Sequence, residues 1–397
     1  MKKRKLKTSV KVILTIIIIS LLACLGYYVV DKKNVIDKIF KNNESNKVEE
    51  KSNNNSNSNS NEPKVEEPKE KRMSLVMVGD ALIHGAVYMD AYKNGKYDFT
   101  NMFTDVAPVI AKYDLRYYNQ ESIIGGGIPQ HYPRLNSPDA IGENLISMGF
   151  NLVSLANNHS FDQNEKGLQY SIKFWKSHSD KIHSAGSYSS FEEQAEIPIY
   201  EQNGIKYAFL SYTIPTNGLS APKGKEYYVN VYNEKQVTED VVKARNKGAE
   251  VVLVAMHWGV EYTHVPTEEQ KNVAKFLSSI GVDIVIGSHP HVIQPIEYVG
   301  NTLVIYSLGN FISAQRILGL EKTIGLLVGT DIVVKDKKVS FENTNFELLY
   351  TYSTQSDTKF KVIPFSKLSN NVLNNYQTIN TKYRNIVDQA GVFNGNK

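Results

Sequence analysis

Cysteine is almost absent from this sequence, and its scarcity restricts the chemistry that the chain can use. The only cysteine among the 397 residues is Cys24, so an intramolecular disulfide and a cysteine-based zinc site are both excluded. A metal site would therefore have to use His, Asp, Glu and Asn side chains. Apolar residues make up 41% of the chain, which is enough for a folded core and excludes disorder over the full length.

An excess of positive charge is also absent from most of the chain. The net charge is +4, and removing the basic residues of the first eleven positions leaves −2 for the rest. Those basic residues are Lys2, Lys3, Arg4, Lys5, Lys7 and Lys11. Because the basicity is confined to one end, a nucleic-acid-binding surface is not indicated and we expect no nucleic-acid partner.

Residues 12–30 carry no charge and are long enough to span a membrane. At about 1.5 Å per residue, a helix of this length crosses the roughly 30 Å hydrocarbon layer. The preceding basic residues favour a cytoplasmic N-terminus, which places the remainder outside the cell. Two alternatives stay open: a cleavable signal peptide, and a lipoprotein signal, since Leu21-Leu22-Ala23-Cys24 is similar to a lipobox. We favour an uncleaved anchor because apolar residues continue beyond Cys24.

The composition divides the chain into five segments. Residues 31–71 are rich in Lys, Glu, Asn and Ser and have little to bury, so they predict a disordered linker. A folded domain is expected over 72–350, and residues 351–397 read as a C-terminal tail or docking segment with a helix near 366–386. Before the linker lie the basic cytoplasmic tail, 1–11, and the transmembrane anchor, 12–30.

The pattern of the folded domain is typical of an α/β protein. Short apolar runs rich in β-branched residues alternate with stretches of helical period. Helices are predicted over 101–112, 137–149, 165–177, 235–247 and 267–280, the last of them ending before a glycine, Gly281.

Polar residues follow six of the apolar runs, at the points where strands are expected to end. In an α/β sheet such strand ends meet at one edge, so these side chains are expected to converge. Each has a structural alternative, such as a turn at Asp80 or a helix cap at Asn158, but their joint placement favours a metal site. The six endings are Gly79-Asp80, Asn119-Gln120-Glu121, Asn157-Asn158-His159, His257-Trp258-Gly259, Ser288-His289-Pro290-His291 and Gly309-Asn310-Phe311.

In this order, the six blocks resemble the CapA family of capsule-biosynthesis proteins, over about residues 73–315. That family is the membrane-anchored component of poly-γ-glutamate production, and it is similar to the calcineurin-like metallophosphoesterases. The resemblance implies a four-layer αββα sandwich with a two-metal centre at the strand ends. It also implies a single-pass protein of the cell membrane whose partners are other membrane subunits of the polymer synthase.

The resemblance assigns a role to each matching residue. Asp80 and His291 would bind the first metal, and Asn158, His257 and His289 the second, with Glu121 bridging the two and His159 acting as general acid. The superfamily's His two residues after the first Asp is replaced by Leu82, with His84 nearest to it, and Glu121 stands where an Asp is usual. One or two divalent ions, Mn, Fe, Zn or Mg, are therefore expected.

Four further residues are candidates for the same site. Arg134 could hold a carboxylate or phosphate, or simply pair with a surface acid. Asn157 and Asn310 are further candidates for binding substrate, and Asn119, like His84, is a possible site residue.

Three functions fit these features. The first is an anchored extracellular subunit that handles poly-γ-glutamate or an anionic precursor at the metal site. The second is a metal-dependent phosphoesterase acting on a substrate of the cell envelope. The third is a scaffold that keeps the polar cluster for structure alone.

Overall fold

The structure is a computed structural model that describes residues 70–393. The predicted anchor, residues 12–30, and almost all of the predicted linker lie outside the described residues. Within the described part, no helix combines the length and apolar character needed to cross a membrane.

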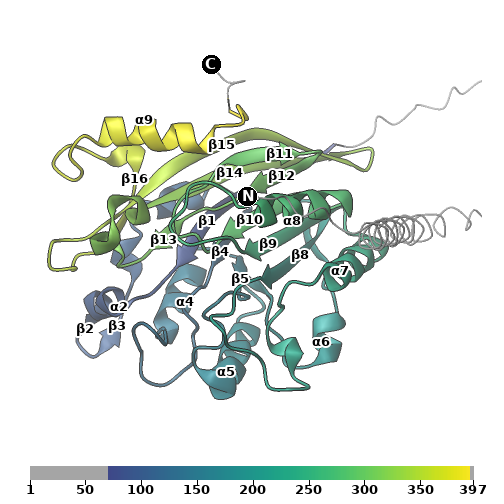
Figure 1. Cartoon of the computed structure of the whole chain (residues 1–397), viewed down its shortest axis with the longest axis horizontal. Helices are drawn as coiled ribbons and strands as arrows, with labels where there is room; N and C mark the ends of the chain where they lie inside the picture. Colours follow the sequence, from purple (N-terminus) through teal and green to yellow (C-terminus); the bar gives the residue numbers. More distant parts are fainter. Residues whose placement is uncertain (1–69, 394–397) are drawn as a thin grey trace, which may run out of the picture. The chain divides into compact units, whose positions relative to one another are not determined.

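Two β-sheets form the centre of the fold (Figure 1). In the first sheet the strand order is β16 (Lys361–Pro364), β15 (Lys338–Tyr352), β14 (Ile324–Lys335), β1 (Lys71–Ala81), β4 (Leu115–Asn119), β5 (Leu152–Ser154) and β6 (His183–Ala185), with β13 (Asn310–Ile312) also pairing with β1. The order in the second is β11 (Ile296–Val299), β12 (Thr302–Ile305), β10 (Ile284–Ser288), β9 (Val251–His257), β8 (Ile205–Thr213) and β7 (Tyr200–Gln202). A separate small hairpin pairs β2 (Tyr92–Lys93) with β3 (Lys96–Tyr97).

The strands that lead to the predicted site run parallel to one another. β1, β4, β5 and β6 are successive parallel neighbours in the first sheet, as are β8, β9, β10 and β12 in the second. The carboxyl ends of neighbouring parallel strands therefore lie at one edge of each sheet.

Alternate residues of the strands supply two different cores. On β1, Leu75 and Met77 belong to the core that also contains Phe209 and Leu253 of the second sheet, whereas Val76 and Val78 pack on the opposite face. Because both faces are buried, these strands read as continuous apolar runs rather than as alternating ones. The α/β class predicted from the sequence is confirmed.

Helices cover the outer face of each sheet. Helices α2 (Gly85–Ala91), α3 (Ala107–Ile110), α4 (Asp139–Ser147) and α5 (Asn164–Ser177) pack on the first sheet, and α7 (Glu234–Asn246) and α8 (Glu268–Ser279) on the second. A further short helix is α6 (Phe191–Ala195). The layers in the described part are thus helix, sheet, sheet and helix.

Four of the five predicted helices match α4, α5, α7 and α8, with ends differing by at most two residues. The fifth, over 101–112, is wrong in extent: a 3₁₀ turn at Thr100–Met102 is followed by α3, which begins at Ala107. Pro108 lacks an N–H and is tolerated in the first turn, so the helix starts there instead of running through it.

The first sheet continues past residue 350, although the sequence predicted a C-terminal tail or docking segment from residue 351. β15 runs to Tyr352, and β16 pairs with it in antiparallel register. Beyond it, α9 (Tyr376–Val387) buries Tyr383 and Val387 in the same core that lies between the sheets, and it appears in yellow beside β15 and β16 in Figure 1. The helix is shorter than the predicted 366–386 because Asn375 adopts a left-handed backbone, with φ 56°, directly before it.

Candidate metal centre

The six polar blocks converge where the two sheets meet. Asp80 is the last residue but one of β1, and Glu121 lies two residues beyond β4. From the second sheet, His257 ends β9, and His289 and His291 follow β10. All five side chains are buried. Strand ends from both sheets therefore bring together residues that are up to 211 positions apart in the sequence.

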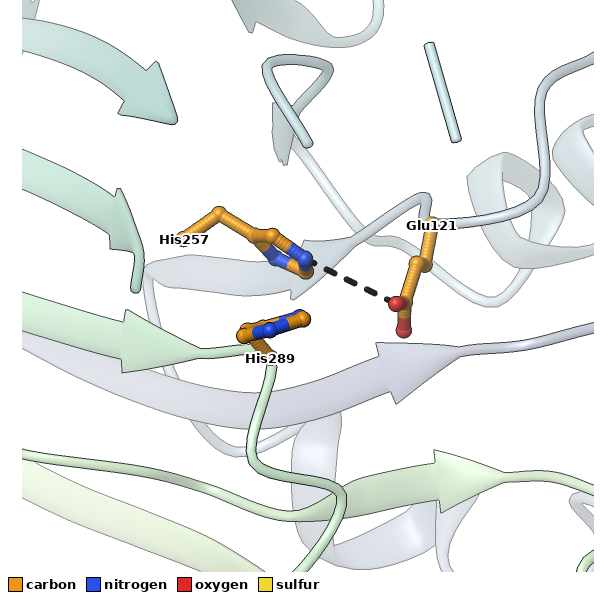
Figure 2. A group of neighbouring side chains, drawn as sticks. All are labelled: Glu121, His257 and His289. Carbon is orange, nitrogen blue, oxygen red and sulfur yellow. Dashed lines mark ion pairs between the residues drawn. The ribbon is translucent and has the colours of Figure 1, made fainter. Parts of the chain in front are cut away.

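Two groups of potential ligands share Glu121. The first contains Asp80, Glu121 and His291, and the second contains Glu121, His257 and His289. In each group the ligand atoms lie within 4.8 Å of one another. Figure 2 shows the second group, in which both imidazoles and the carboxylate face a common point. A carboxylate shared in this way is the arrangement expected of a ligand that bridges two cations.

Short distances connect Glu121, which follows a strand of the first sheet, to two histidines of the second sheet. Its Oε1 atom lies 3.6 Å from His257 Nε2 and also 3.6 Å from His291 Nε2. In the first ligand group, Asp80 Oδ2 lies 3.6 Å from His291 Nδ1. Asn158 lies beside the second ligand group, with its Oδ1 atom 2.9 Å from His257 Nε2.

The unpaired polar atoms of this cluster fit a cation. Both carboxylate oxygens of Glu121 and Nδ1 of His289 are buried without a hydrogen-bond partner among residues 70–393. A buried carboxylate without a donor is costly, and a divalent cation would satisfy it. Asp, Glu, Asn and His together suit ions of hard to intermediate character, such as Mn²⁺, Fe²⁺, Zn²⁺ or Mg²⁺.

Burial governs the protonation of the ligands. It raises the pKa of Glu121 well above its usual range, which the positive charge of His291 only partly offsets. For the imidazoles, burial and the neighbouring histidines lower the pKa of His289 to about 3 and that of His257 well below its usual range. Burial also opposes protonation of His291, but the Glu121 and Asp80 carboxylates outweigh it and raise that pKa to about 9.

Backbone strain marks the His-Pro-His segment. His289 and His291 have φ values of 97° and 57°, in a region that residues other than glycine seldom adopt. Strain of this kind is retained where surrounding contacts enforce it. Here, Asn310 accepts from His291 Nδ1 at 3.1 Å and donates to the His291 carbonyl at 3.3 Å. This leaves Nε2 of His291 facing Glu121.

His159 forms a pair with a carboxylate that the sequence analysis missed. Its Nδ1 atom lies 2.7 Å from Oδ2 of Asp162, and the same oxygen accepts the Leu135 N–H at 2.7 Å. Asp162 thereby fixes the ring and leaves Nε2 as its free nitrogen. The sequence signal was an acid three residues after the histidine, in the same turn.

A cleft of about 770 Å³ opens above the cluster. Its wall includes His159, His291, Arg134 and His84. Arg134 is exposed and donates to the Asp162 carbonyl at 3.2 Å, so its guanidinium lies beside the His159–Asp162 pair. Other lining residues that the sequence analysis did not propose include Tyr132, Leu219, Glu261, Tyr262, Ile317 and Leu318.

His84, Asn157 and Asn310 are candidates that belong to neither ligand group. His84 lines the cleft, but its Nδ1 atom accepts the Ala314 N–H at 3.3 Å and lies 3.1 Å from the Leu82 carbonyl. Asn157 and Asn310 are buried and do not line the cleft. Asn157 holds its own loop by accepting the His159 N–H at 3.0 Å and donating to the Gln120 carbonyl at 2.9 Å.

The fold and the cluster define a mixed α/β protein with a candidate dinuclear metal centre between two sheets. The chain belongs to the family described as bacterial capsule synthesis protein PGA_cap, whose family model matches residues 74–315.

Two curated relatives carry capsule-related names. The PGA biosynthesis protein CapA of Bacillus subtilis (strain 168) is 28% identical over 260 residues, which cover 64% of this chain and 66% of the relative. The capsule biosynthesis protein CapA of Bacillus anthracis is 28% identical over 261 residues, covering 63% and 62% respectively. Each match thus spans slightly less than two thirds of the relative's length.

Solved structures with a similar arrangement include phosphoesterases. A novel phosphatase from Mycoplasma pneumoniae aligns at a TM-score of 0.45 and 16% identity, covering 71% of this chain and 95% of that one. The calcineurin-like phosphoesterase YfkN from Bacillus subtilis aligns at a TM-score of 0.41 and 13% identity, covering 79% and 99%.

Proposed function

We propose that this protein is a membrane-anchored, extracellular component of poly-γ-glutamate capsule biosynthesis, and that its buried cluster binds two divalent cations to handle the anionic polymer or its precursor. The family and the names of the curated relatives support the role in the capsule. The observation that carries the cation site is Glu121, shared by two ligand groups and lacking any hydrogen-bond donor in the described part.

The proposed anchor is residues 12–30, and the linker 31–71 would separate it from a four-layer αββα domain. Other membrane subunits of the polymer synthase are the proposed partners. The basic N-terminal tail supports the cytoplasmic placement of the N-terminus.

The cleft offers the polymer complementary charge. Two bound cations would supply concentrated positive charge for carboxylate or phosphate oxygens. Arg134, on the cleft wall, can hold a second anionic group through its planar guanidinium. Asp80 and Glu121 belong to the ligand groups and would hold the cations rather than the substrate.

A second candidate is a metal-dependent phosphoesterase of the cell envelope, and the His159–Asp162 pair favours it. With Nδ1 of His159 held by Asp162, a proton on Nε2 would face the cleft and could be donated to a leaving oxygen. Capsule assembly itself does not require such a donor if the polymer is only bound.

The capsule role is tested by complementation of a producing host that lacks its own copy. Asp80→Ala and His289→Ala should each abolish poly-γ-glutamate production while the protein still reaches the membrane, as measured by polymer assay and immunoblot. His131→Ala is the matched control, since this exposed imidazole belongs to neither ligand group. Normal production by both site variants would overturn the role of the cation site.

The two candidates are separated by elemental analysis and a phosphoesterase assay on the purified chain. Both expect about two bound Mn²⁺ ions, and the second also expects hydrolysis of p-nitrophenyl phosphate that His159→Ala lowers without loss of metal. Metal binding without hydrolysis would favour the first candidate. A chain that binds no divalent ion would contradict both.

A further inference from the structure

A buried chain of hydrogen bonds leads from the core between the sheets to the Asp80 carboxylate. The hydroxyl of Tyr117 lies 2.8 Å from Ser154 Oγ, which donates to Asn119 Oδ1 at 2.7 Å. Asn119 Nδ2 then donates to Asp80 Oδ1 at 2.8 Å. The four residues come from β4, β5 and β1, and the most exposed of them has only 3% of its surface accessible.

The donors and acceptors of this chain allow one direction only. The Asp80 oxygen accepts in this bond, so the amide of Asn119 presents its NH₂ group to Asp80. Its oxygen then faces Ser154, whose single hydroxyl proton is used in that bond. Tyr117 must therefore donate to Ser154. Each bond polarises the next, and the series ends on the carboxylate.

This arrangement distinguishes the two oxygens of Asp80. Oδ1 is occupied by Asn119, whereas Oδ2 lies 3.6 Å from His291 Nδ1 and accepts the His289 N–H at 3.3 Å. Oδ2 is thus the oxygen that lies beside the histidines of the ligand groups. Rotation of the carboxylate about its Cβ–Cγ bond would break the bond to Asn119.

We propose that Asn119, Ser154 and Tyr117 are positioning residues that fix the orientation of the Asp80 carboxylate, with Oδ2 directed at the cation. The inference rests on the proposed cation site and adds residues that make no contact with the ion. Partners behind a metal ligand orient it and set its basicity, and their loss typically weakens metal binding by about 10- to 100-fold.

The neighbouring tyrosine provides a matched control. Tyr117 and Tyr118 are consecutive on β4 and both are fully buried, but their side chains point to opposite faces of the sheet. The Tyr118 hydroxyl has no hydrogen-bond partner among the described residues. Replacing either tyrosine by phenylalanine removes one buried hydroxyl, yet only Tyr117→Phe shortens the chain to Asp80.

The experiment measures Mn²⁺ affinity of the full chain by titration calorimetry, with folding checked by circular dichroism. Asn119→Leu, which keeps the approximate volume, should weaken affinity by about 10- to 100-fold. Ser154→Ala should have a smaller effect, Tyr117→Phe the smallest, and Tyr118→Phe none. The EPR spectrum of bound Mn²⁺ should change in Asn119→Leu because the geometry of Asp80 changes.

Several results would overturn this inference. One is unchanged Mn²⁺ affinity in folded Asn119→Leu, or in both Ser154→Ala and Tyr117→Phe if the first variant does not fold. Another is an equal loss in Tyr117→Phe and Tyr118→Phe, which would reflect packing alone. If the unsubstituted chain bound no Mn²⁺, the proposed function would fail together with the inference, whereas the first two results leave the cation site intact.

Discussion

At the scale of single residues, Glu121 has an unfavourable environment unless a cation is bound. Its carboxylate is fully buried and has no hydrogen-bond donor among the described residues. It lies beside His257, whose pKa is lowered mainly by burial, and His291, whose pKa is raised by the neighbouring carboxylates. Removing the charge therefore has opposite effects on folding and on metal binding.

Glu121→Gln preserves the shape of the side chain and eliminates its charge. In EDTA, the melting temperature should stay the same or rise, because a buried carboxyl group without a hydrogen-bond donor is lost. Mn²⁺ affinity should fall at least about tenfold, the lower end of the loss seen for outer partners of a ligand. For the unsubstituted chain, Mn²⁺ at about 100 times its dissociation constant should add roughly 2.7 kcal/mol of stability.

Calorimetry with and without EDTA checks both parts. Glu268→Gln is the control, since that side chain is exposed at the start of α8 and is 80% accessible. A lower melting temperature in EDTA together with full Mn²⁺ binding would show that Glu121 is a structural residue.

Asp162→Asn tests the pair formed with His159. The amide can donate to Nδ1 and stabilise the wrong tautomer, so phosphoester turnover should fall between about 10²- and 10⁴-fold, as for loss of general acid catalysis. Bound Mn²⁺ should be unchanged, because Asp162 is in neither ligand group. Asp180→Asn, an exposed acid beyond α5, is the control. Parallel loss of metal and turnover would instead indicate that Asp162 supports the cluster.

At the scale of elements, the position of each ligand side chain depends on the contacts that hold the loop after its strand. The loop after β9 leads to α8, which begins with a capping box in which Thr267 accepts the Gln270 N–H and the Gln270 side chain accepts the Thr267 N–H. Gln270 is fully buried and also donates to Gln294 Oε1 at 2.8 Å. The cap therefore ties α8 to the loop that follows the His-Pro-His segment.

Thr267→Ala removes the side-chain half of this box. The free energy of unfolding should fall by about 1 kcal/mol, the usual value of an N-cap hydroxyl. Thr267→Ser keeps the acceptor and should lose much less. Urea denaturation measures both, and equal stability of the alanine and unsubstituted proteins would mean that packing alone sets the start of α8.

At the scale of the whole molecule, the C-terminal segment completes the core that the two sheets share. Phe365, Leu368, Tyr383 and Val387 are buried in that core, beyond the end of β15. Burial of each such side chain stabilises a fold by roughly 1.5–3 kcal/mol, so together they approach the 5–15 kcal/mol of a typical domain.

A chain ending at Tyr352 should therefore fail to fold cooperatively. It should show no sharp thermal transition and should bind a hydrophobic dye, whereas a chain ending at Phe393, the last described residue, should melt like the full chain. A cooperative transition in the shorter chain, within a few degrees of the longer one, would show that residues 353–393 are a dispensable appendage.

Much of the candidate site could be predicted from the sequence, because strand ends are local features. The alternation of apolar runs with helical stretches predicted the α/β class, and the polar residues that follow those runs, such as Asp80, His257 and His291, predicted the ligand types. Asp162 was missed because its importance depends on the turn that folds it back onto His159. Asn119 was named only as a possible site residue, since its bond to Asp80 crosses between two strands.

The sequence by itself determined the alternation of strands and helices, the exclusion of cysteine chemistry and the residue types available to a cation. These follow from side-chain polarity and short-range periodicity, which neighbouring residues decide. Only the tertiary structure decided that Glu121 is shared by ligands from both sheets, that one oxygen of Asp80 is held from behind, and that the C-terminal residues complete the core. Such relations join atoms far apart in the chain, and packing of the two sheets sets their distances.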